Sequence, residues 1–288
     1  DAPRIGFKST DYKSKDSGDW GINLQYYVER WSLETSFIYM NNTDRLTSGL
    51  YASIGDTTEK ENELARQTNA VLLGHYGWVY KDDIDTFGIS LSKEWLGISW
   101  GADVVYRNNN ALNPDLNASL SAPVVRSEVD PGNYPGPTGD SLHVVMNAFG
   151  LLNADWGLWE GGNYIVEATF SKLDSFGDFE EKANPFIKED RWTSHIGIVF
   201  RPTWYQVRAG WDLTLPMSIS YTIDGEQTPN SAGGNEEVGN GSLGMEFLVN
   251  EAWRMSAKYN FYFGPQGNGT AAYIKDRDNI SLTIKRTF

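Results

Sequence analysis

Strict alternation of apolar and polar residues is the feature that most restricts how this chain can fold. In residues 277–288, one parity holds Ile280, Leu282, Ile284 and Phe288, and the other holds Ser281, Thr283, Lys285 and Thr287. A period of two predicts a β-strand with one face toward an apolar environment and the other toward water. The same alternation recurs in residues 20–28, 98–107, 213–224 and 253–263. The chain is therefore predicted to be all-β.

Composition excludes several classes of protein. No apolar run approaches the ~20 residues that a membrane-spanning helix needs, so a helical membrane protein is excluded. A mean hydropathy of −0.45 is compatible with a membrane β-barrel, because only alternate residues of each strand face lipid. Aromatic residues make up 14% of the chain, which argues against disorder. A net charge of −14 disfavours nucleic acid as a partner.

The pattern predicts about eleven strands, joined alternately by short turns and long polar loops. The strands are residues 17–28, 31–43, 74–93, 96–107, 140–152, 160–173, 190–207, 213–224, 239–250, 252–263 and 277–288. The long connections are residues 44–73, 108–139, 174–189, 225–238 and 264–276. Short turns on one rim and long loops on the other are typical of outer-membrane barrels, whose long loops are extracellular.

Some predicted elements carry irregularities. Residues 74–93 are taken as one strand with a bulge, although Lys81, Asp82 and Asp83 lie in its middle. Pro202 predicts a second bulge in 190–207, because proline cannot donate to the ladder. Within loop 44–73, residues 58–61 have the capping-box pattern and predict a short helix.

Tryptophans lie at or beside the predicted short turns. They are Trp31, Trp95, Trp156, Trp159, Trp211 and Trp253. An indole prefers the lipid headgroup layer, where its ring is buried and its N–H stays hydrated. These residues are therefore predicted to form a membrane girdle. The alternative is an aromatic core at the strand ends of a soluble sheet.

The predicted strand number is odd, whereas single-chain bacterial barrels have an even number of strands and both ends in the periplasm. An edge strand cannot face lipid unpaired, because its backbone polar groups would find no partner there. We therefore expect at least one upstream strand, from the same polypeptide or a companion chain, to pair with residues 17–28 and 277–288.

Several blocks of sequence point to a known family. They are residues 16–26 and 39–42, residues 80–90 and 105–107, and residues 221–225, 261–264 and 276–288. These blocks resemble a family of long proteobacterial outer-membrane proteins catalogued only as a domain of unknown function. The family often has Pro-Glu-Asp-Ile where this chain has Lys81-Asp-Asp-Ile84.

The resemblance covers the C-terminal part of such proteins and implies a transmembrane antiparallel β-barrel of the bacterial outer membrane. Residues 1–288 would then form the barrel or its C-terminal part, surrounded by lipid and lipopolysaccharide. The aromatic end of the chain, Phe288, also resembles the assembly signal of outer-membrane barrels, in which the terminal strand is recognised by the barrel assembly machinery.

Charged and ionisable side chains share the inward parity of the predicted strands. These candidate pore-lining residues are Glu34, Asp103, Arg107, Glu167, His195, Asp224, Glu246, Arg254, Lys258 and Lys285. In a small barrel such groups pack as a closed ion-pair core, whereas in a wide barrel opposed acidic and basic walls line water and orient polar solutes. The sequence leaves both open. Loop 108–139 is long enough to fold inward as a constriction.

Catalytic signatures are weak. The chain has 3 histidines, and none falls in a Ser-His-Asp order or at zinc-ligand spacing. We therefore expect no enzyme, no metal and no cofactor. The main hypothesis is a passive, porin-like channel for small amphipathic or hydrophobic molecules, as members of the family it resembles are suspected to be. The alternatives are a structural or adhesive barrel whose acidic loops bind a partner or lipopolysaccharide, and a barrel hydrolase.

Overall fold

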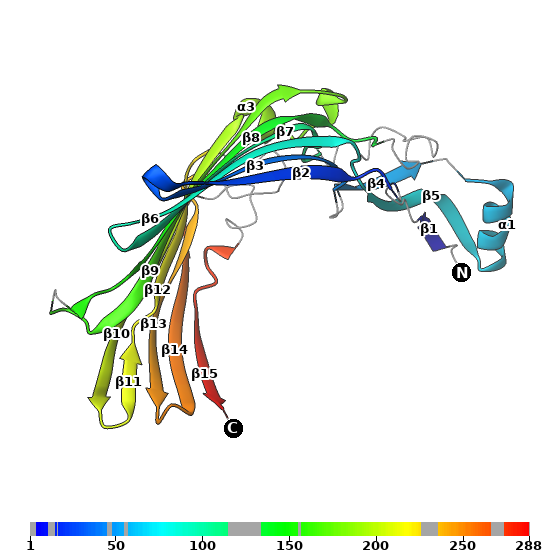
Figure 1. Cartoon of the computed structure of the whole chain (residues 1–288). Helices are drawn as coiled ribbons and strands as arrows, with labels where there is room; N and C mark the ends of the chain where they lie inside the picture. The colour runs from blue at the N-terminus through cyan, green and yellow to red at the C-terminus, as the bar shows by residue number, and fades with distance from the viewer. Residues whose placement is uncertain are drawn as a thin grey trace.

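The structure, a computed structural model, describes residues 4–10, 15, 17–44, 48–54, 57–114, 134–154, 157–225, 236–265 and 274–287. One large curved antiparallel sheet forms an arch and carries a small three-stranded sheet at one end (Figure 1). The large sheet contains β2 (Trp20–Val28), β3 (Leu33–Asn42), β6 (Ile84–Trp95), β7 (Ile98–Ala111), β8 (Thr138–Leu151), β9 (Gly161–Phe176), β10 (Trp192–Arg208), β11 (Trp211–Thr214), β12 (Met217–Asp224), β13 (Gly239–Val249), β14 (Trp253–Phe263) and β15 (Asn279–Arg286). The prediction of an all-β, antiparallel chain is confirmed.

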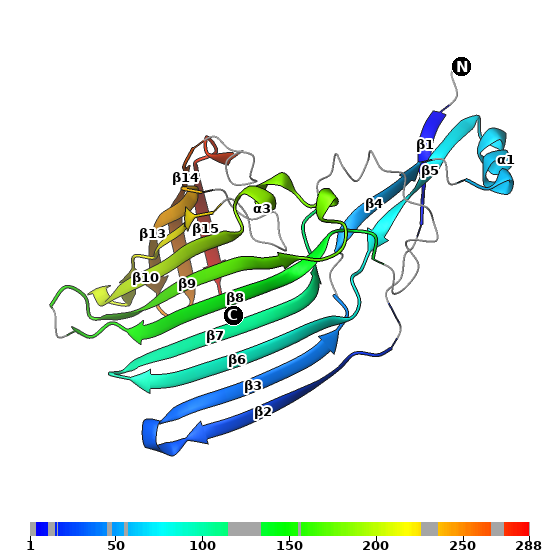
Figure 2. The same ribbon diagram turned by 90° about the horizontal axis from the view of Figure 1, so that it is seen from above.

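The large sheet is open. Its strands follow the order β15-β14-β13-β11-β10-β9-β8-β7-β6-β3-β2, and β12 pairs with β10 and β13. Figure 2 shows β2, β3, β6, β7 and β8 lying side by side, with β13 to β15 turned away from them by the twist and curl of the sheet. Within the described residues, β2 and β15 are therefore its two edges.

Prolines interrupt one predicted strand. Residues 213–224 are divided into β11 and β12 by Leu215 and Pro216. The amide of Leu215 donates to Pro202 O at 3.0 Å, and the amide of Gly244 donates to Pro216 O at 2.8 Å. β10 itself runs unbroken through Pro202 and pairs regularly with β9 there. Its register toward β11 shifts after that proline, between Trp204 and Arg208. The break between β11 and β12 falls at Pro216, which lacks the amide that would continue the ladder.

The prediction of a single strand over residues 74–93 is also wrong. β5 (Ala70–Val79) belongs to the small sheet, and the large sheet resumes only at β6. Asp83 has a φ of 56°, a left-handed conformation outside the β region of regular strands, and it lies in the segment between β5 and β6. Lys81 instead joins a turn, since its amide donates to Ser48 Oγ at 2.9 Å and its carbonyl accepts from the Asp44 amide at 2.9 Å.

The small sheet was largely missed by the sequence patterns. β1 (Arg4–Ser9) runs parallel to β5, and β4 (Gly49–Ile54) runs antiparallel to it. The helix predicted within loop 44–73 is confirmed as α1 (Glu59–Gln67), which begins with a capping box between Thr58 and Glu61. None of the helices in the described part of the chain is long and apolar enough to cross a membrane.

A compact cap forms where β7, β8 and β9 reach the long-loop rim. β9 is followed by η4 (Glu180–Lys182) and α3 (Pro185–Glu189). Leu112, Leu173 and Ile187 are almost fully buried together, with Phe176 packed against them. Much of the predicted loops 108–139, 225–238 and 264–276 lies outside the described residues, at 115–133, 226–235 and 266–273.

Glu61 ties the small sheet together. Its Oε1 accepts from Lys8 Nζ at 2.7 Å and lies 3.2 Å from His75 Nε2, so one carboxylate joins β1, α1 and β5. The hydrogen bond from Lys8, reinforced by those from Thr58 and His75, holds the pKa of Glu61 well below its ordinary value of 4.5. This stabilisation is present above that ordinary pKa and is lost as the pH falls further.

We therefore expect acid to loosen the small sheet. Amide hydrogen exchange in β1 and α1, corrected for the intrinsic rate, should accelerate as the pH falls from about 5 to about 3. Glu61→Gln should abolish this pH dependence and raise exchange at neutral pH, because the contact with Lys8 loses its charge. Glu63→Gln, at an exposed position of the same helix, is the control. An unchanged pH profile in Glu61→Gln would contradict this role.

Candidate functional site

Cross-strand register places the apolar positions of all strands of the large sheet on one face. Residues directly opposite each other in an antiparallel pair share a face, as Met255 does with Ile284 and Phe247. We call this set the apolar belt; one member per strand is given by Leu24, Phe37, Ile89, Val104, Met146, Val166, Ile198, Ile219, Leu243, Met255 and Leu282. No helix or second sheet packs on it in the described part of the chain.

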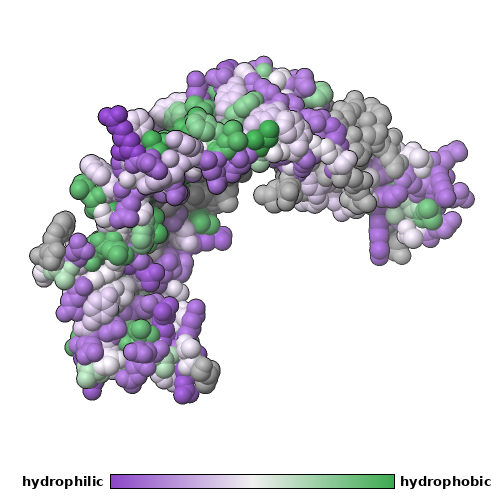
Figure 3. All heavy atoms as spheres, viewed as in Figure 1, coloured by the Kyte–Doolittle hydropathy of each residue, from purple (hydrophilic) through white to green (hydrophobic). Residues whose placement is uncertain are grey.

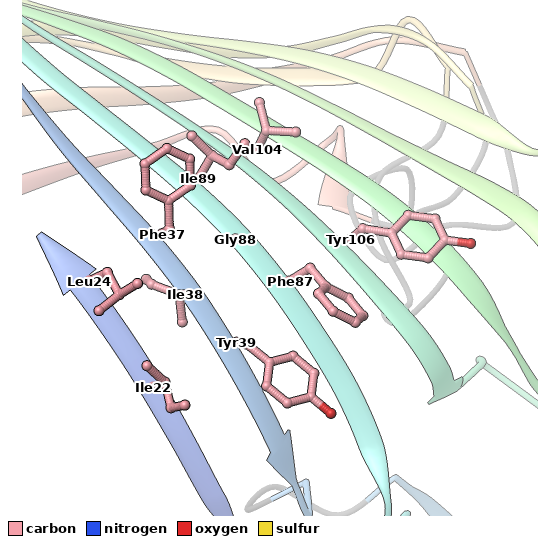
Figure 4. Close-up of a pocket in the computed structure, with 10 residues that line it drawn as sticks. All are labelled: Ile22, Leu24, Phe37, Ile38, Tyr39, Phe87, Gly88, Ile89, Val104 and Tyr106. Atoms are coloured by element: carbon pink, nitrogen blue, oxygen red, sulfur yellow. The ribbon is translucent and has the colours of Figure 1, made fainter.

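The belt lies on the convex side of the arch. Large members are strongly exposed, with 64% for Leu24 and 55% for Met146. In Figure 3 hydrophobic residues gather over the outer curve near β2 and β3, whereas both ends of the arch are mostly hydrophilic. Between β2 and β7 the belt contains an open groove of about 470 Å³ lined by residues such as Ile22, Phe37 and Phe87 (Figure 4). This groove belongs to the outer surface and not to the concave side.

The predicted tryptophans lie along the short-turn rim. Trp31, Trp95 and Trp253 are exposed there. Trp211 packs edge-on against Phe247 with ring centroids 5.6 Å apart. Trp159 likewise meets Phe200 at 5.4 Å, and the Arg286 guanidinium lies 5.1 Å from the Trp253 ring. Trp156 lies outside the described residues.

A second aromatic row, which the sequence analysis missed, lies at the long-loop end of the belt. Tyr39 of β3 contacts Trp20 of β2 at 5.1 Å and Phe87 of β6 at 4.9 Å between ring centroids. Farther along the sheet, Tyr221 and Phe263 stack at 5.9 Å. The pairs Tyr39–Phe87 and Tyr221–Phe263 join strands that are not consecutive in sequence, so only the register reveals the row. The belt is therefore bordered by aromatic residues at both ends.

The concave face separates its charges by strand. Acidic Glu34, Asp103 and Glu167 belong to β3, β7 and β9, whereas Arg254, Lys258 and Lys285 belong to β14 and β15. Arg254 lies directly opposite Lys285.

Glu246 of β13 is the exception within the basic group. Its Oε1 is 3.6 Å from Arg254 Nε and 3.9 Å from Arg201 Nη2. Arg201, which shares the strand parity of the predicted residue His195, was missed by the sequence analysis.

Other predicted residues are held by partners. Arg107 Nη2 pairs with Asp44 Oδ1 at 2.8 Å, and both side chains are at least three-quarters buried. His195 Nε2 and Ser220 Oγ lie 2.8 Å apart. The pairing of β10 with β12 shifts register between Ser194 and His195, and Asp224 lies opposite Ser194 past that shift. Asp224 therefore does not share the strand face of the other candidate residues.

A Ser-His cluster lies on the same face. Asn110 Nδ2 donates to Ala111 O, which turns Asn110 Oδ1 toward Ser141. Ser141 Oγ donates its one proton to that oxygen at 2.9 Å, so the 2.9 Å contact with His143 Nε2 is a donation from the imidazole. His143 Nδ1 then accepts from Ser171 Oγ at 2.9 Å.

This direction of donation prevents His143 from acting as a base toward Ser141. Ser141 is also fully buried, with a relative exposure of 0%. The cluster is therefore arranged as a structural hydrogen-bond chain and not as a nucleophile with its base. Within the described residues, no group of three or more His, Asp or Glu side chains is placed to hold a metal ion.

Comparison with known proteins yields one match. A family described as "Protein of unknown function (DUF1302)" matches residues 2–288. No curated protein matches the chain. No solved structure matches it either.

Breaking this hydrogen-bond chain should measurably lower the stability of the fold. Ser141→Ala should lower the free energy of unfolding by about 1–3 kcal/mol, because the Asn110 carbonyl oxygen and the His143 N–H lose their buried partner. Guanidinium unfolding in detergent, followed by tryptophan fluorescence, measures this. Ser90→Ala on the same face, where the side chain is only half-buried, should change stability by less than about 0.5 kcal/mol. Equal losses for both variants would contradict the assignment.

Proposed function

The chain belongs to the DUF1302 family of proteins of unknown function, and we propose that it forms the wall of a transmembrane β-barrel in the bacterial outer membrane that passes small amphipathic molecules. The observation that carries this proposal is the apolar belt. It runs in register across the strands of the large sheet on the convex side, while the concave side is mostly polar and charged. This is the two-faced pattern that a water-filled barrel in lipid requires.

The height of the belt supports the proposal. β14 has 11 residues, from Trp253 at one end to Phe263 at the other, which corresponds to about 33 Å along the strand. At the ~45° tilt of membrane strands this spans about 23 Å, close to the ~25 Å apolar band of outer-membrane barrels. Aromatic residues at both ends match the two interfacial girdles of such proteins.

Water is a poor environment for the same surface. Monomeric soluble proteins rarely expose contiguous apolar patches larger than a few hundred Å², and the belt crosses the entire large sheet without a covering layer. In lipid the apolar belt would face hydrocarbon instead of water. The edge strands β2 and β15 would then carry unpaired backbone N–H and C=O groups, which are costly in hydrocarbon. The proposed barrel is therefore closed by further strands on both edges, from the same polypeptide or a companion segment.

The concave face supports a passive channel. Its charged groups include Glu34, Glu167, Lys258 and Lys285, which are exposed and would line water. In this proposal loop 108–139 forms the constriction, the acidic loops and lipopolysaccharide lie outside the cell, and the barrel assembly machinery recognises the terminal strand. Residues 115–133 and Phe288 lie outside the described residues. A structural or adhesive barrel would share the belt but would not conduct.

Membrane insertion predicts a strong asymmetry between the two faces. Met146→Arg and Leu282→Arg should each cost about 2–4 kcal/mol near mid-membrane, because the charge would face hydrocarbon. Ser281→Arg, the neighbour of Leu282 on the opposite face, should cost much less. Unfolding titrations in lipid vesicles measure the order. If Ser281→Arg were the most destabilising variant, the assignment of the faces would be wrong.

Conductance separates the channel from the structural or adhesive barrel. The native polypeptide that contains this chain should form stable pores in planar bilayers. Shortening residues 115–133 should raise single-channel conductance, because the proposed constriction is removed. The same change in loop 226–235 is the control and should have a smaller effect. Absence of conductance in all forms would overturn the channel and leave the adhesive barrel.

A further inference from the structure

The concave face departs from its polar pattern across β8, β9 and β10, as it also does at Ile38 of β3 and Val105 of β7. Phe149, Ile165 and Val199 lie directly opposite one another across β8, β9 and β10. Leu151, two residues after Phe149, shares their face. We call these four residues the apolar ledge. Phe149, Ile165 and Leu151 are exposed, at 39%, 42% and 65%, and Val199 is half-buried.

The ledge is not explained by packing. The buried apolar cluster of the described residues lies at the opposite, long-loop end of these strands, and the apolar belt lies on the other face. An exposed apolar group at positions where a polar residue would be expected is unfavourable unless it serves a function. Exposed apolar patches bordered by polar residues commonly mark binding sites.

Cations adjoin the ledge on the side of β13 to β15. Arg201 follows Val199 by two residues on β10, so it shares the face of the ledge. Arg201 and Leu151 both lie opposite Asn163 of β9, on either side of it. Through Glu246, Arg201 is joined to Arg254, which in turn lies opposite Lys285.

Charge on the two sides of the ledge differs in sign. On the basic side, Glu246 is the carboxylate that Arg201 and Arg254 share, and Lys285 adds a third cation. On β9, Glu167 lies two residues after the ledge member Ile165 on the shared strand face and is exposed. An anionic group would therefore be repelled from the Glu167 side and attracted toward Arg201 and Arg254.

We propose that the apolar ledge and these cations form one subsite for an amphipathic anion with a single apolar tail. The tail lies along the ledge, and the carboxylate or sulfate head lies between Arg201 and Arg254. This inference rests on the proposed channel and names the class of solute that it takes. Glu246 competes with the head for both guanidinium groups, which keeps binding weak enough for release, as conduction demands.

Side-chain exposure makes the cations accessible. Arg201 and Arg254 have side-chain exposures of 43% and 55%, and their distances to Glu246 are long for a tight ion pair. Both guanidinium groups therefore keep donors available for a ligand. Their exposure also means that neutral substitutions there should leave the fold intact.

The subsite is tested by the equilibrium binding of three probes that share a decyl-type alkyl chain. Decanoate, decanol and decyltrimethylammonium share a tail and differ in head charge. Each is measured below its micelle-forming concentration on the native polypeptide in lipid nanodiscs, with empty nanodiscs subtracted. Decanoate should bind most tightly. The double variant Arg201→Gln/Arg254→Gln should weaken decanoate by at least about tenfold and leave decanol unchanged, because charge-assisted hydrogen bonds are lost.

Matched variants separate head from tail. Ile165→Ser should weaken decanoate and decanol alike, since both use the ledge. Arg286→Gln, which removes a cation from β15 on the convex parity, should change neither. Unchanged decanoate binding in the double variant, or equally tight binding of decyltrimethylammonium, would overturn the subsite.

Failure of the proposed subsite can be distinguished from failure of the proposed channel. Binding is measured without flux, and conductance of potassium chloride is measured in the same variants. Pores that conduct but do not discriminate among the probes would leave the channel standing and overturn the subsite. Selective decanoate binding without conductance would support the subsite and overturn the channel.

Discussion

Cross-strand register is the constraint on which the rest of this structure depends. Side chains alternate with a period of two, so a slip of one residue between any neighbouring strands would exchange the faces of every strand beyond it. The pairing from β2 to β15 holds the apolar positions on one side throughout. An apolar belt, a charged concave face and two aromatic rims are all consequences of that one property.

Places where the regular pattern fails are structurally informative. Asp83, with its left-handed backbone, lies where the chain passes from β5 of the small sheet to β6 of the large sheet. Pro216 divides β11 from β12 for want of an amide proton. The apolar ledge is a different case, since its strands are regular and only the chemistry of the side chains departs from the pattern. For that reason we interpret the ledge as a ligand-binding feature, and Asp83 and Pro216 as features of the fold.

The chemistry of the concave face is that of binding and orientation. Its Ser-His cluster donates protons in the direction opposite to that needed for a nucleophile, and Ser141 is buried. Apart from Arg107, Asp224 and Glu246, its candidate charges are segregated, with acids on β3, β7 and β9 and cations on β14 and β15, next to Arg201 of β10. Such a surface favours solutes with one charged end and one apolar end, which agrees with the proposed passage of amphipathic molecules.

Local pattern in the sequence was sufficient for much of this description. Alternation in segments such as 253–263 determined both the strand and its faces, because a strand in a two-sided environment encodes each face in every second residue. The capping box at Thr58 and Glu61 likewise specified the start of α1, since it involves only residues three positions apart.

Only the tertiary structure decided which strands are neighbours. β1 and β5 pair in parallel although Arg4 and Ala70 are far apart in sequence, and such non-local pairing leaves no local signature. The same holds for the aromatic row that joins Tyr39 to Phe87 and for the contact of Arg201 with Glu246. The sequence by itself thus determined the two faces of the strands. The three-dimensional arrangement decided their order, their breaks and the assembly of side chains from distant strands, because these depend on contacts between segments that no local period can encode.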